Sequence, residues 1–346
     1  MTPTKTPQPI SRERILGLFA KFPAVRVAVI GDVMLDRYLI GDAERLSPEA
    51  PVPVVTVREH RAALGGAGNV AANVAAMGAA CHLVGVVGDD GHARTIRTEL
   101  LAAGLGDEHL LTIPGRPTTS KSRLVARGQQ VVRIDEEVDT PIEGADRTRL
   151  REVALARVEE ADVLLLQDYN KGVLCRELIA ELIAAARKRA VPIIVDPKYR
   201  HFFDFAGATV FKPNRRELET ALGAAVDLAH WDSLPAALQR LQVDNLLVTL
   251  GADGMALVAT DGSVTHFAGV TRPVYDVSGA GDTVTAWLGT ALAAGATLQE
   301  AAILGNYAAA IEVGKPLVAT VTPGEVLQLH EEQHDQIGRL RRGGVI

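Results

Sequence analysis

The sequence of 346 residues predicts an α/β fold, in which helices cover both faces of a largely parallel sheet. Apolar runs typical of buried strands alternate with Ala- and Leu-rich runs typical of helices through most of the chain. Several expected strands also end in a polar residue or a glycine, namely Asp32, Asp168, Asp196, Asn214 and Gly251. Because ligands of open α/β sheets bind at the carboxyl ends of the strands, these ends indicate a binding site.

The expected elements follow one another in a regular order. Strands are predicted at residues 25–32, 82–90, 161–168, 191–197, 207–214 and 245–251. Helices are predicted at residues 69–79, 176–190, 283–295 and 298–313. There is no internal repeat or low-complexity linker, so we expect one domain over residues 25–330. Residues 1–24 are expected to form an N-terminal extension with a first helix, and residues 331–346 a C-terminal tail.

Residues 36–57 and 119–136 break this rhythm. Both segments alternate polar and apolar residues, the first is punctuated by prolines, and the second has a turn at Arg127 and Gly128. Alternation of this kind is typical of half-exposed antiparallel strands. We therefore predict a small β lid over the open end of the sheet, with an ordinary edge hairpin as the alternative.

Composition excludes several classes of protein. A formal net charge of −6, from 36 basic and 42 acidic residues, argues against a general nucleic-acid binder. No run is long and apolar enough to span a bilayer, and the first residues carry no secretory signal, so we expect a cytoplasmic protein without a membrane partner. Cys81 and Cys175 form neither a disulfide framework nor a metal-ligand pattern.

Gly279, Ala280, Gly281 and Asp282 form the strongest chemical motif, where a loop enters a helix. Small residues let backbone N–H groups approach an anion closely, and the helix dipole adds positive charge. The motif therefore predicts an anion hole for a transferring phosphate, with Asp282 placed to accept a hydroxyl proton. The alternative is an ordinary acidic residue after a glycine-rich turn.

Two further motifs are less specific. Asn214 and Glu217 face the same side of a helix start, where their oxygens could organise Mg²⁺, although a helix-capping arrangement would use the same residues. Gly66, Gly68 and Ala71 match a dinucleotide fingerprint only weakly, because no clean buried strand precedes them. A glycine-rich turn that binds sugar hydroxyls fits this segment better, and no Walker-type loop occurs anywhere in the chain.

Taken together, GGAGNVAANVAAMG, NRRE and DVSGAGDT resemble, in order and spacing, the ribokinase-like pfkB carbohydrate kinases over roughly residues 25–321. The resemblance implies a three-layer α/β/α sandwich with a β-sheet lid, and ATP and Mg²⁺ as cofactors. It implies Asp282 as catalytic base, with the backbone of residues 279–281 as anion hole. The implied nucleotide-side residues are Asn214, Glu217, Thr249, Gly251, Gly254 and Asn306, of which Asn214 and Glu217 organise Mg²⁺. For Asn306, a helix-surface amide is the alternative.

Within that family, VMLDRYLIGDAERLSPEAPVPVV, QDYNKGVL and VDPK resemble the D-glycero-β-D-manno-heptose-7-phosphate kinases of lipopolysaccharide-core biosynthesis. The resemblance implies phosphorylation of the anomeric hydroxyl. The implied substrate-binding residues are Asp32, Asp36, Gly65, Gly66, Asn69, Lys121, Arg123, Arg133, Asn170 and Lys171, and Arg45 is a further candidate for the sugar phosphate. Each cation alone could instead be a solvated surface charge.

The resemblance also leads to expectations about the assembly of the protein, and several alternative functions remain open. In many organisms such kinases are fused to an adenylyltransferase, and no nucleotidyltransferase signature is present, so we expect a stand-alone kinase. The apolar PVPVV segment of the lid is a plausible dimer surface, and we expect a homodimer. The remaining alternatives are a kinase for a different sugar, a non-catalytic sugar- or nucleotide-binding regulator, and a nicotinamide-dependent dehydrogenase.

Overall fold

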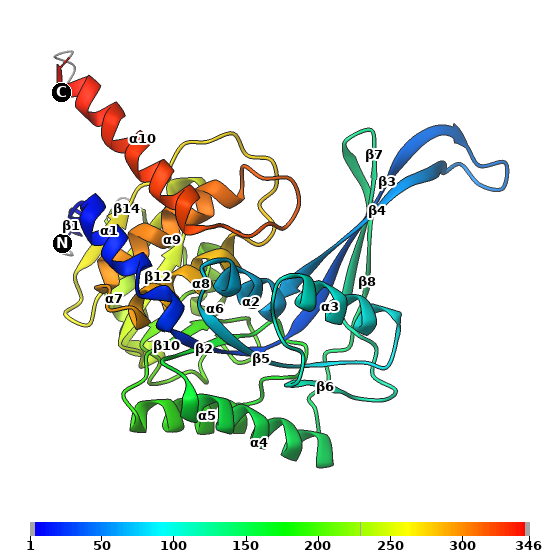
Figure 1. The fold of residues 1–346 in the computed structure, drawn as a ribbon, viewed down its shortest axis with the longest axis horizontal. Coiled ribbons are helices and arrows are strands. Elements are labelled where there is room, and N and C mark those ends of the chain that lie inside the picture. Colours follow the sequence, from blue (N-terminus) through cyan, green and yellow to red (C-terminus); the bar gives the residue numbers. More distant parts are fainter. Residues whose placement is uncertain (1–3, 229, 343–346) are drawn as a thin grey trace.

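In the part of the chain that the structure describes, a ten-stranded mixed sheet forms the centre of the fold, and helices pack on both of its faces (Figure 1). The computed structural model describes residues 4–228 and 230–342. The strands are ordered β1-β14-β13-β12-β11-β10-β9-β2-β5-β6, and all neighbours are parallel except around β13. The predicted α/β fold, with its largely parallel sheet and separate lid, is confirmed.

The elements of the sheet layer and its helices have the following bounds. The strands are β1 Thr4–Lys5, β2 Arg26–Gly31, β5 Ala80–Val87, β6 Leu110–Thr112, β9 Val163–Gln167, β10 Ile193–Asp196, β11 Val210–Phe211, β12 Asn245–Thr249, β13 Met255–Val258 and β14 Val264–Phe267. The helices are α1 Arg12–Phe19, α2 Ala67–Ala76, α3 Gly91–Ala102, α4 Gly144–Glu160, α5 Arg176–Lys188, α6 Arg215–Leu222, α7 Leu234–Leu241, α8 Ala280–Ala293, α9 Leu298–Glu312 and α10 Pro323–Arg342.

Two apolar cores hold the layers together, one on each face of the sheet. Successive side chains of a strand point to opposite faces, so Val27 and Val29 of β2 join one core while Ala28 and Ile30 join the other. Helices α1, α2, α3, α8, α9 and α10 cover the first core, and α4, α5, α6 and α7 cover the second. Strands buried on both faces are continuous apolar runs, which is why the sequence identified them.

The chain reverses its direction of travel across the sheet between β2 and β9. From β2 it proceeds outward through β5 and β6, and it then returns to build β9, β10, β11 and β12 on the other side. A crevice at the carboxyl ends of the strands is expected at such a switch point. Asp32 and Asp168 directly follow β2 and β9, so both aspartates lie at this crevice.

The predicted lid is a separate four-stranded sheet that projects from the body as an arm (Figure 1). Its strands are β3 Val33–Leu46, β4 Pro53–Gly66, β7 Ser120–Ala126 and β8 Gln129–Glu136. Arg127 and Gly128 have φ values of 52° and 76°, as the predicted turn between β7 and β8 requires.

The first lid segment is longer than predicted, because β4 continues through residues 58–66 up to the start of α2. Residues 58–61 are exposed on both faces of the arm, so this part of the sequence lacks the alternation that identifies a strand. A strand thus does precede the glycine-rich turn, but it is an antiparallel lid strand rather than the first strand of a βαβ unit. The dinucleotide fingerprint therefore remains without its structural context.

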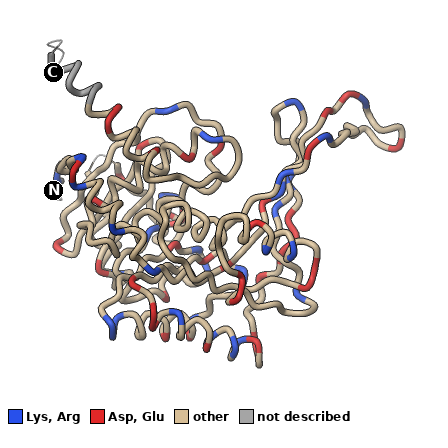
Figure 2. Tube along the Cα trace, in the orientation of Figure 1, with Lys and Arg blue, Asp and Glu red and all other residues tan. Residues whose placement is uncertain are grey.

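The remaining expectations concern the ends of the chain and its surface. The predicted boundary at residue 330 falls inside α10, and residues 343–346 lie outside the described part. Within the described residues, no helix combines the length and apolarity needed to cross a bilayer. Basic and acidic residues are interspersed along the arm and the body rather than segregated (Figure 2).

Candidate active site

Asp282 lies in the first turn of α8 and is almost fully buried, with 4% of its surface exposed. Its carboxylate accepts hydrogen bonds from the Asn69 amide (3.1 Å), the Gln167 amide (2.5 Å) and the Tyr169 hydroxyl (2.8 Å). Burial, followed by the nearby charge of Asp196, raises the pKa of the Asp282 carboxyl to about 7. A carboxyl with this pKa suits a general base that works near neutral pH.

The backbone before Asp282 has the conformation expected of an anion hole. Gly279 is the residue before α8 and has a φ of 95°, and α8 begins at Ala280. A Cβ at position 279 would lie 2.8 Å from the Asn69 amide nitrogen, so this position requires glycine for both conformation and space. The N–H groups of the first helical turn have no intrahelical partners and are available to an anion.

Lys212 is a charged residue of this site that sequence reasoning missed. Only 2% of its surface is exposed, and its ammonium lies 3.0 Å from the carboxylate of Asp196. Asp196 also accepts a 3.0 Å hydrogen bond from Gln167, which joins this pair to Asp282. A Cβ on Gly281 would lie 3.5 Å from the ammonium, so the positive charge of Lys212 stands beside the anion hole.

Asn214 and Glu217 form the capping arrangement that was the alternative to a magnesium site. The Asn214 side chain accepts a hydrogen bond from the Glu217 backbone N–H, and the Glu217 carboxylate accepts one from the Asn214 backbone N–H, both at 2.8 Å. The other carboxylate oxygen of Glu217 pairs with Lys198. The link of these residues to Mg²⁺ stays a prediction.

Lys198 connects this helix start to Asp282. Its ammonium lies 4.9 Å from the centre of the Tyr169 ring, and the Tyr169 hydroxyl donates to Asp282. Burial lowers the pKa of Lys198, but the carboxylates of Asp196 and Glu217 outweigh burial and raise it overall. Lys198 is therefore a permanent cation between the predicted base and the predicted nucleotide side.

The other predicted nucleotide residues lie around the end of β12. Thr249 forms a bridge with Asn214, and Gly251 and Gly254 have φ values of 63° and 87° in the turn that follows. Asn306 on α9 donates a 2.8 Å hydrogen bond to the carbonyl of Ala268, after β14. Thr249 thus adjoins the capping helix, whereas contacts of all these residues with a nucleotide stay predictions.

Asp32 holds the loop after β9 in place. Its carboxylate accepts hydrogen bonds from the backbone N–H groups of Tyr169 (2.7 Å), Lys171 (2.9 Å) and Val173 (3.2 Å). The side chain is 1% exposed, and burial raises its pKa. Asp32 therefore stabilises this loop, a role that the sequence did not indicate. Whether it also contacts a sugar is not tested by these contacts and stays a prediction.

The predicted sugar cradle lies where β4 meets α2. Asp36 packs against Gly65, where a Cβ would lie 2.3 Å from its carboxylate, and it forms a largely buried ion pair with Arg123. Gly66 has a φ of 58° and precedes the helix that carries Asn69. A hollow of about 450 Å³ lies against this segment, with walls from β4, α2, α3 and residues 318–320.

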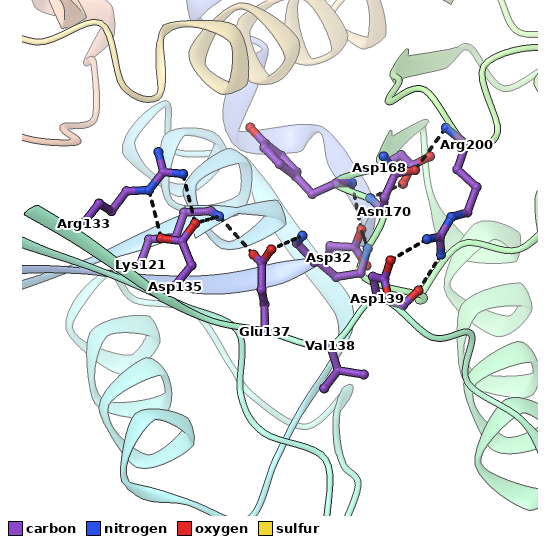
Figure 3. A network of polar contacts seen from close by, with 12 residues as sticks. Asp32, Lys121, Arg133, Asp135, Glu137, Val138, Asp139, Asp168, Asn170 and Arg200 are labelled. Atoms are coloured by element: carbon purple, nitrogen blue, oxygen red, sulfur yellow. Dashed lines mark hydrogen bonds and ion pairs between the residues drawn. The ribbon is translucent and has the colours of Figure 1, made fainter.

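The structure brings Lys121 and Lys171 together at the base of the lid, because both ammonium groups contact Glu137. Figure 3 shows Lys121 with its acidic partners Asp135 and Glu137. Arg133 is half exposed and pairs with Asp135 of its own strand. Asn170, also in this loop, is buried with a left-handed φ of 54° and donates its backbone N–H to Asp168.

Arg45 does not belong to this group. It lies nine residues beyond Asp36 along β3, which corresponds to roughly 30 Å in a strand. Asp36 is paired with Lys121 in the lid register, whereas Arg45 is exposed near the far end of the arm. Within one chain the structure therefore does not bring Arg45 together with Lys121, because the arm extends further than the sequence indicated, and a contact of Arg45 with the sugar phosphate stays a prediction.

Glu312 is an unusual neighbour of the anion hole. It is 0% exposed, and neither of its carboxylate oxygens has a hydrogen-bond partner of good geometry among the described residues. A Cβ on Gly279 would lie 3.2 Å from one of these oxygens. Burial, with smaller contributions from Asp276 and Asp282, raises the pKa of Glu312 to about 8. Glu312 is therefore mostly protonated at neutral pH.

Replacing Glu312 by Gln should stabilise the protein at pH 8 but hardly at pH 4.5. The folded state keeps a proton on Glu312 up to about pH 8, whereas the unfolded chain releases it near its ordinary pKa of 4.5. The free energy of unfolding of the wild type therefore falls as the pH rises from 4.5 to 8. The neutral amide of Gln does not titrate, so the variant should be more stable than the wild type at pH 8 by about 2 kcal/mol or more. Urea unfolding of both proteins at the two pH values measures it, and an equal difference at both would contradict the argument.

Comparison of the sequence with known proteins identifies the family to which the chain belongs. The family profile described as "pfkB family carbohydrate kinase" matches residues 25–324. Proteins named bifunctional protein HldE are similar over most of the chain. The one from Rhodospirillum rubrum is 44% identical over 91% of this chain and 64% of its own length, and the one from Geobacter sulfurreducens is 41% identical over 94% and 67%. The chain thus spans about two thirds of the length of these relatives.

Solved structures resemble the fold. A ribokinase from Arabidopsis thaliana, complexed with ribose and ATP, matches with a TM-score of 0.71 and 22% identity, over 88% of this chain and 98% of that one. Phosphofructokinase-2 from Escherichia coli matches with a TM-score of 0.72 and 18% identity, over 89% and 98%. The predicted ribokinase-like architecture is confirmed by these matches.

Proposed function

Because the chain belongs to the pfkB family of carbohydrate kinases, we propose that it transfers the γ-phosphate of ATP to the anomeric hydroxyl of D-glycero-D-manno-heptose 7-phosphate. The product is the 1,7-bisphosphate, an intermediate toward the heptose of lipopolysaccharide. The observation that carries the sugar-phosphate assignment is the pair Lys121 and Lys171, whose ammonium groups both contact the carboxylate of Glu137. The likeness to proteins named HldE supports the heptose.

The chemistry would proceed at the start of α8. The hydroxyl of the sugar would lose its proton to the Asp282 carboxylate as its oxygen attacks the γ-phosphorus of ATP, while the bond from that phosphorus to the β,γ-bridging oxygen breaks and ADP leaves. The backbone N–H groups of residues 279–281 bind the charge on the transferring group, and Lys212 adds a fixed positive charge beside them. The Gln167 amide and the Tyr169 hydroxyl orient the Asp282 carboxylate throughout.

The nucleotide side fits ATP with Mg²⁺. Thr249, Gly251, Gly254 and Asn306 are proposed to border the nucleotide. Both oxygens of Glu217 are already engaged, one by Lys198 and one by backbone, so this donor set suits Mg²⁺ held through its water shell rather than directly. When bound, the metal would neutralise phosphate charge.

The proposal extends to assembly and compartment. The arm carries exposed apolar side chains, namely Leu46, Val52, Val131, Val132 and Ile134, and its outer strands have free edges. Two copies are proposed to pair through these arms as a homodimer, because exposed apolar edges favour association. Light scattering that gives the mass of a monomer would contradict this arrangement. The proposed compartment is the cytoplasm, where ATP is available.

A substrate panel tests the function. We expect ADP release, followed by a coupled assay, to be fastest with heptose 7-phosphate and much slower with fructose 6-phosphate, ribose and unphosphorylated heptose. The unphosphorylated heptose is the matched control, because it differs only in the group that Lys121 and Lys171 are proposed to bind. Faster turnover of fructose 6-phosphate than of heptose 7-phosphate would make this a kinase for another sugar.

A further inference from the structure

Glu137 occupies the space between the two lysines at the base of the lid. One of its carboxylate oxygens lies 3.1 Å from the ammonium of Lys121 (Figure 3). The other lies 2.9 Å from the ammonium of Lys171. Lys121 belongs to strand β7 of the lid, whereas Lys171 belongs to the loop after β9 in the body. A single carboxylate therefore joins two cations from separate parts of the fold.

The three side chains are only partly hydrated. The exposed fractions are 17% for Lys121, 15% for Lys171 and 31% for Glu137. Burial acts to raise the pKa of Glu137, but the hydrogen bonds from the two lysines outweigh it and lower the pKa. Glu137 is thus an anion at neutral pH, and it neutralises only part of the positive charge that meets there.

Glu137 belongs to no regular element. It follows the last residue of β8 and begins the segment of residues 137–143, which has neither helix nor strand. A side chain in such a segment can turn aside without breaking sheet hydrogen bonds. The lysines, by contrast, are held at their bases by β7 and by the loop that the Asp32 carboxylate binds through the Lys171 N–H.

The other phosphate candidates on lid strands β7 and β8 are not equivalent to this pair. Arg123 is committed to the buried carboxylate of Asp36, and Arg133 is half exposed and paired with Asp135. Lys121 also lies 3.3 Å from Asp135, so it keeps one acidic partner if Glu137 leaves. Lys121 and Lys171 are therefore the cations whose shared partner can be exchanged for a ligand.

We propose that the space between Lys121 and Lys171 is the binding site for the phosphate of the substrate, and that Glu137 is a built-in competitor which this phosphate displaces. The inference rests on the proposed function and adds a residue to it. A phosphomonoester carries a charge near −2 and three acceptor oxygens, against one charge and two oxygens for the carboxylate. The phosphate would then replace Glu137 as the link between lid and body.

The variant Glu137→Gln tests the competition. Without the competing charge, the KM for the phosphorylated sugar should fall about fivefold, as removal of a partly exposed ion pair allows, while the KM for ATP stays as in the wild type. Glu136→Gln is the matched control, because Glu136 neighbours Glu137 but contacts His92 and Ser120 instead. It should leave both KM values as they are.

Titration with inorganic phosphate separates this inference from the substrate assignment. Calorimetry on the full chain should show tighter phosphate binding by Glu137→Gln than by the wild type, and the gain should vanish in Glu137→Gln combined with Lys121→Ala. If Glu137→Gln binds phosphate more tightly but the protein does not turn over heptose 7-phosphate, the substrate assignment fails, whereas the role of Glu137 as a competitor is supported. A higher KM for the sugar phosphate with weaker phosphate binding, or no change in either, would overturn the proposal.

Discussion

Replacing Asp282 by Asn should lower kcat by about 10²–10⁴-fold or more, the range expected for loss of a general base, while the KM for ATP changes little. Asn has almost the same shape, so Gln167, Tyr169 and Asn69 still surround the side chain, but it cannot accept the hydroxyl proton. Initial rates over a range of ATP concentrations measure both constants.

The pH profile gives this prediction a second readout. The active form is the carboxylate, and burial holds the pKa of Asp282 at about 7, so wild-type kcat/KM should rise with pH through neutrality. The residual activity of Asp282→Asn should lack this rise. Asp261→Asn is the matched control, since Asp261 is exposed and paired with Lys5 far from α8. Near-normal turnover by Asp282→Asn would remove Asp282 from the chemistry.

The parts of the fold and of the site that depend on local sequence patterns could be predicted from the sequence. Buried strands appear as continuous apolar runs, and the glycines before Asp282 mark a helix start that an anion can approach. The lid was predicted from alternation, but its length was not. Residues 58–61 are polar and exposed on both faces of the arm, so they show no alternation, and the length of the arm that separates Arg45 from Lys121 could not be predicted.

What the sequence could not give is the pairing of groups that are distant in the chain. The Asp32 carboxylate binds three backbone N–H groups of a loop that lies more than a hundred residues later in the sequence. Glu312 lies next to Gly279 only because α9 packs against α8. The sequence did contain a signal for Lys212, because this lysine follows apolar residues at the end of an expected strand. A lysine that is buried in such a place almost always has a partner. Identifying that partner required the register of β10 and β11.

Replacing Lys212 by Met should destabilise the protein by about 3–5 kcal/mol, the cost of leaving one member of a buried ion pair alone. Met has a similar length and fills the same space, so the loss reports the charge rather than a cavity. Asp196 would keep hydrogen bonds from Gln167 and Thr285, but no other cation among the described residues forms an ion pair with it. Urea unfolding of both proteins measures the difference.

The double variant Asp196→Asn with Lys212→Met decides whether the ion pair is the cause. Removing both charges leaves no unpaired buried ion, so much of the lost stability should return. The same charges act on the base: Asp196 raises the pKa of Asp282, and Lys212 lowers it. The acid limb of kcat/KM should therefore move to higher pH in Lys212→Met and move back in the double variant. If the double variant is as unstable as Lys212→Met and its acid limb stays at the higher pH, Lys212 acts through packing rather than charge.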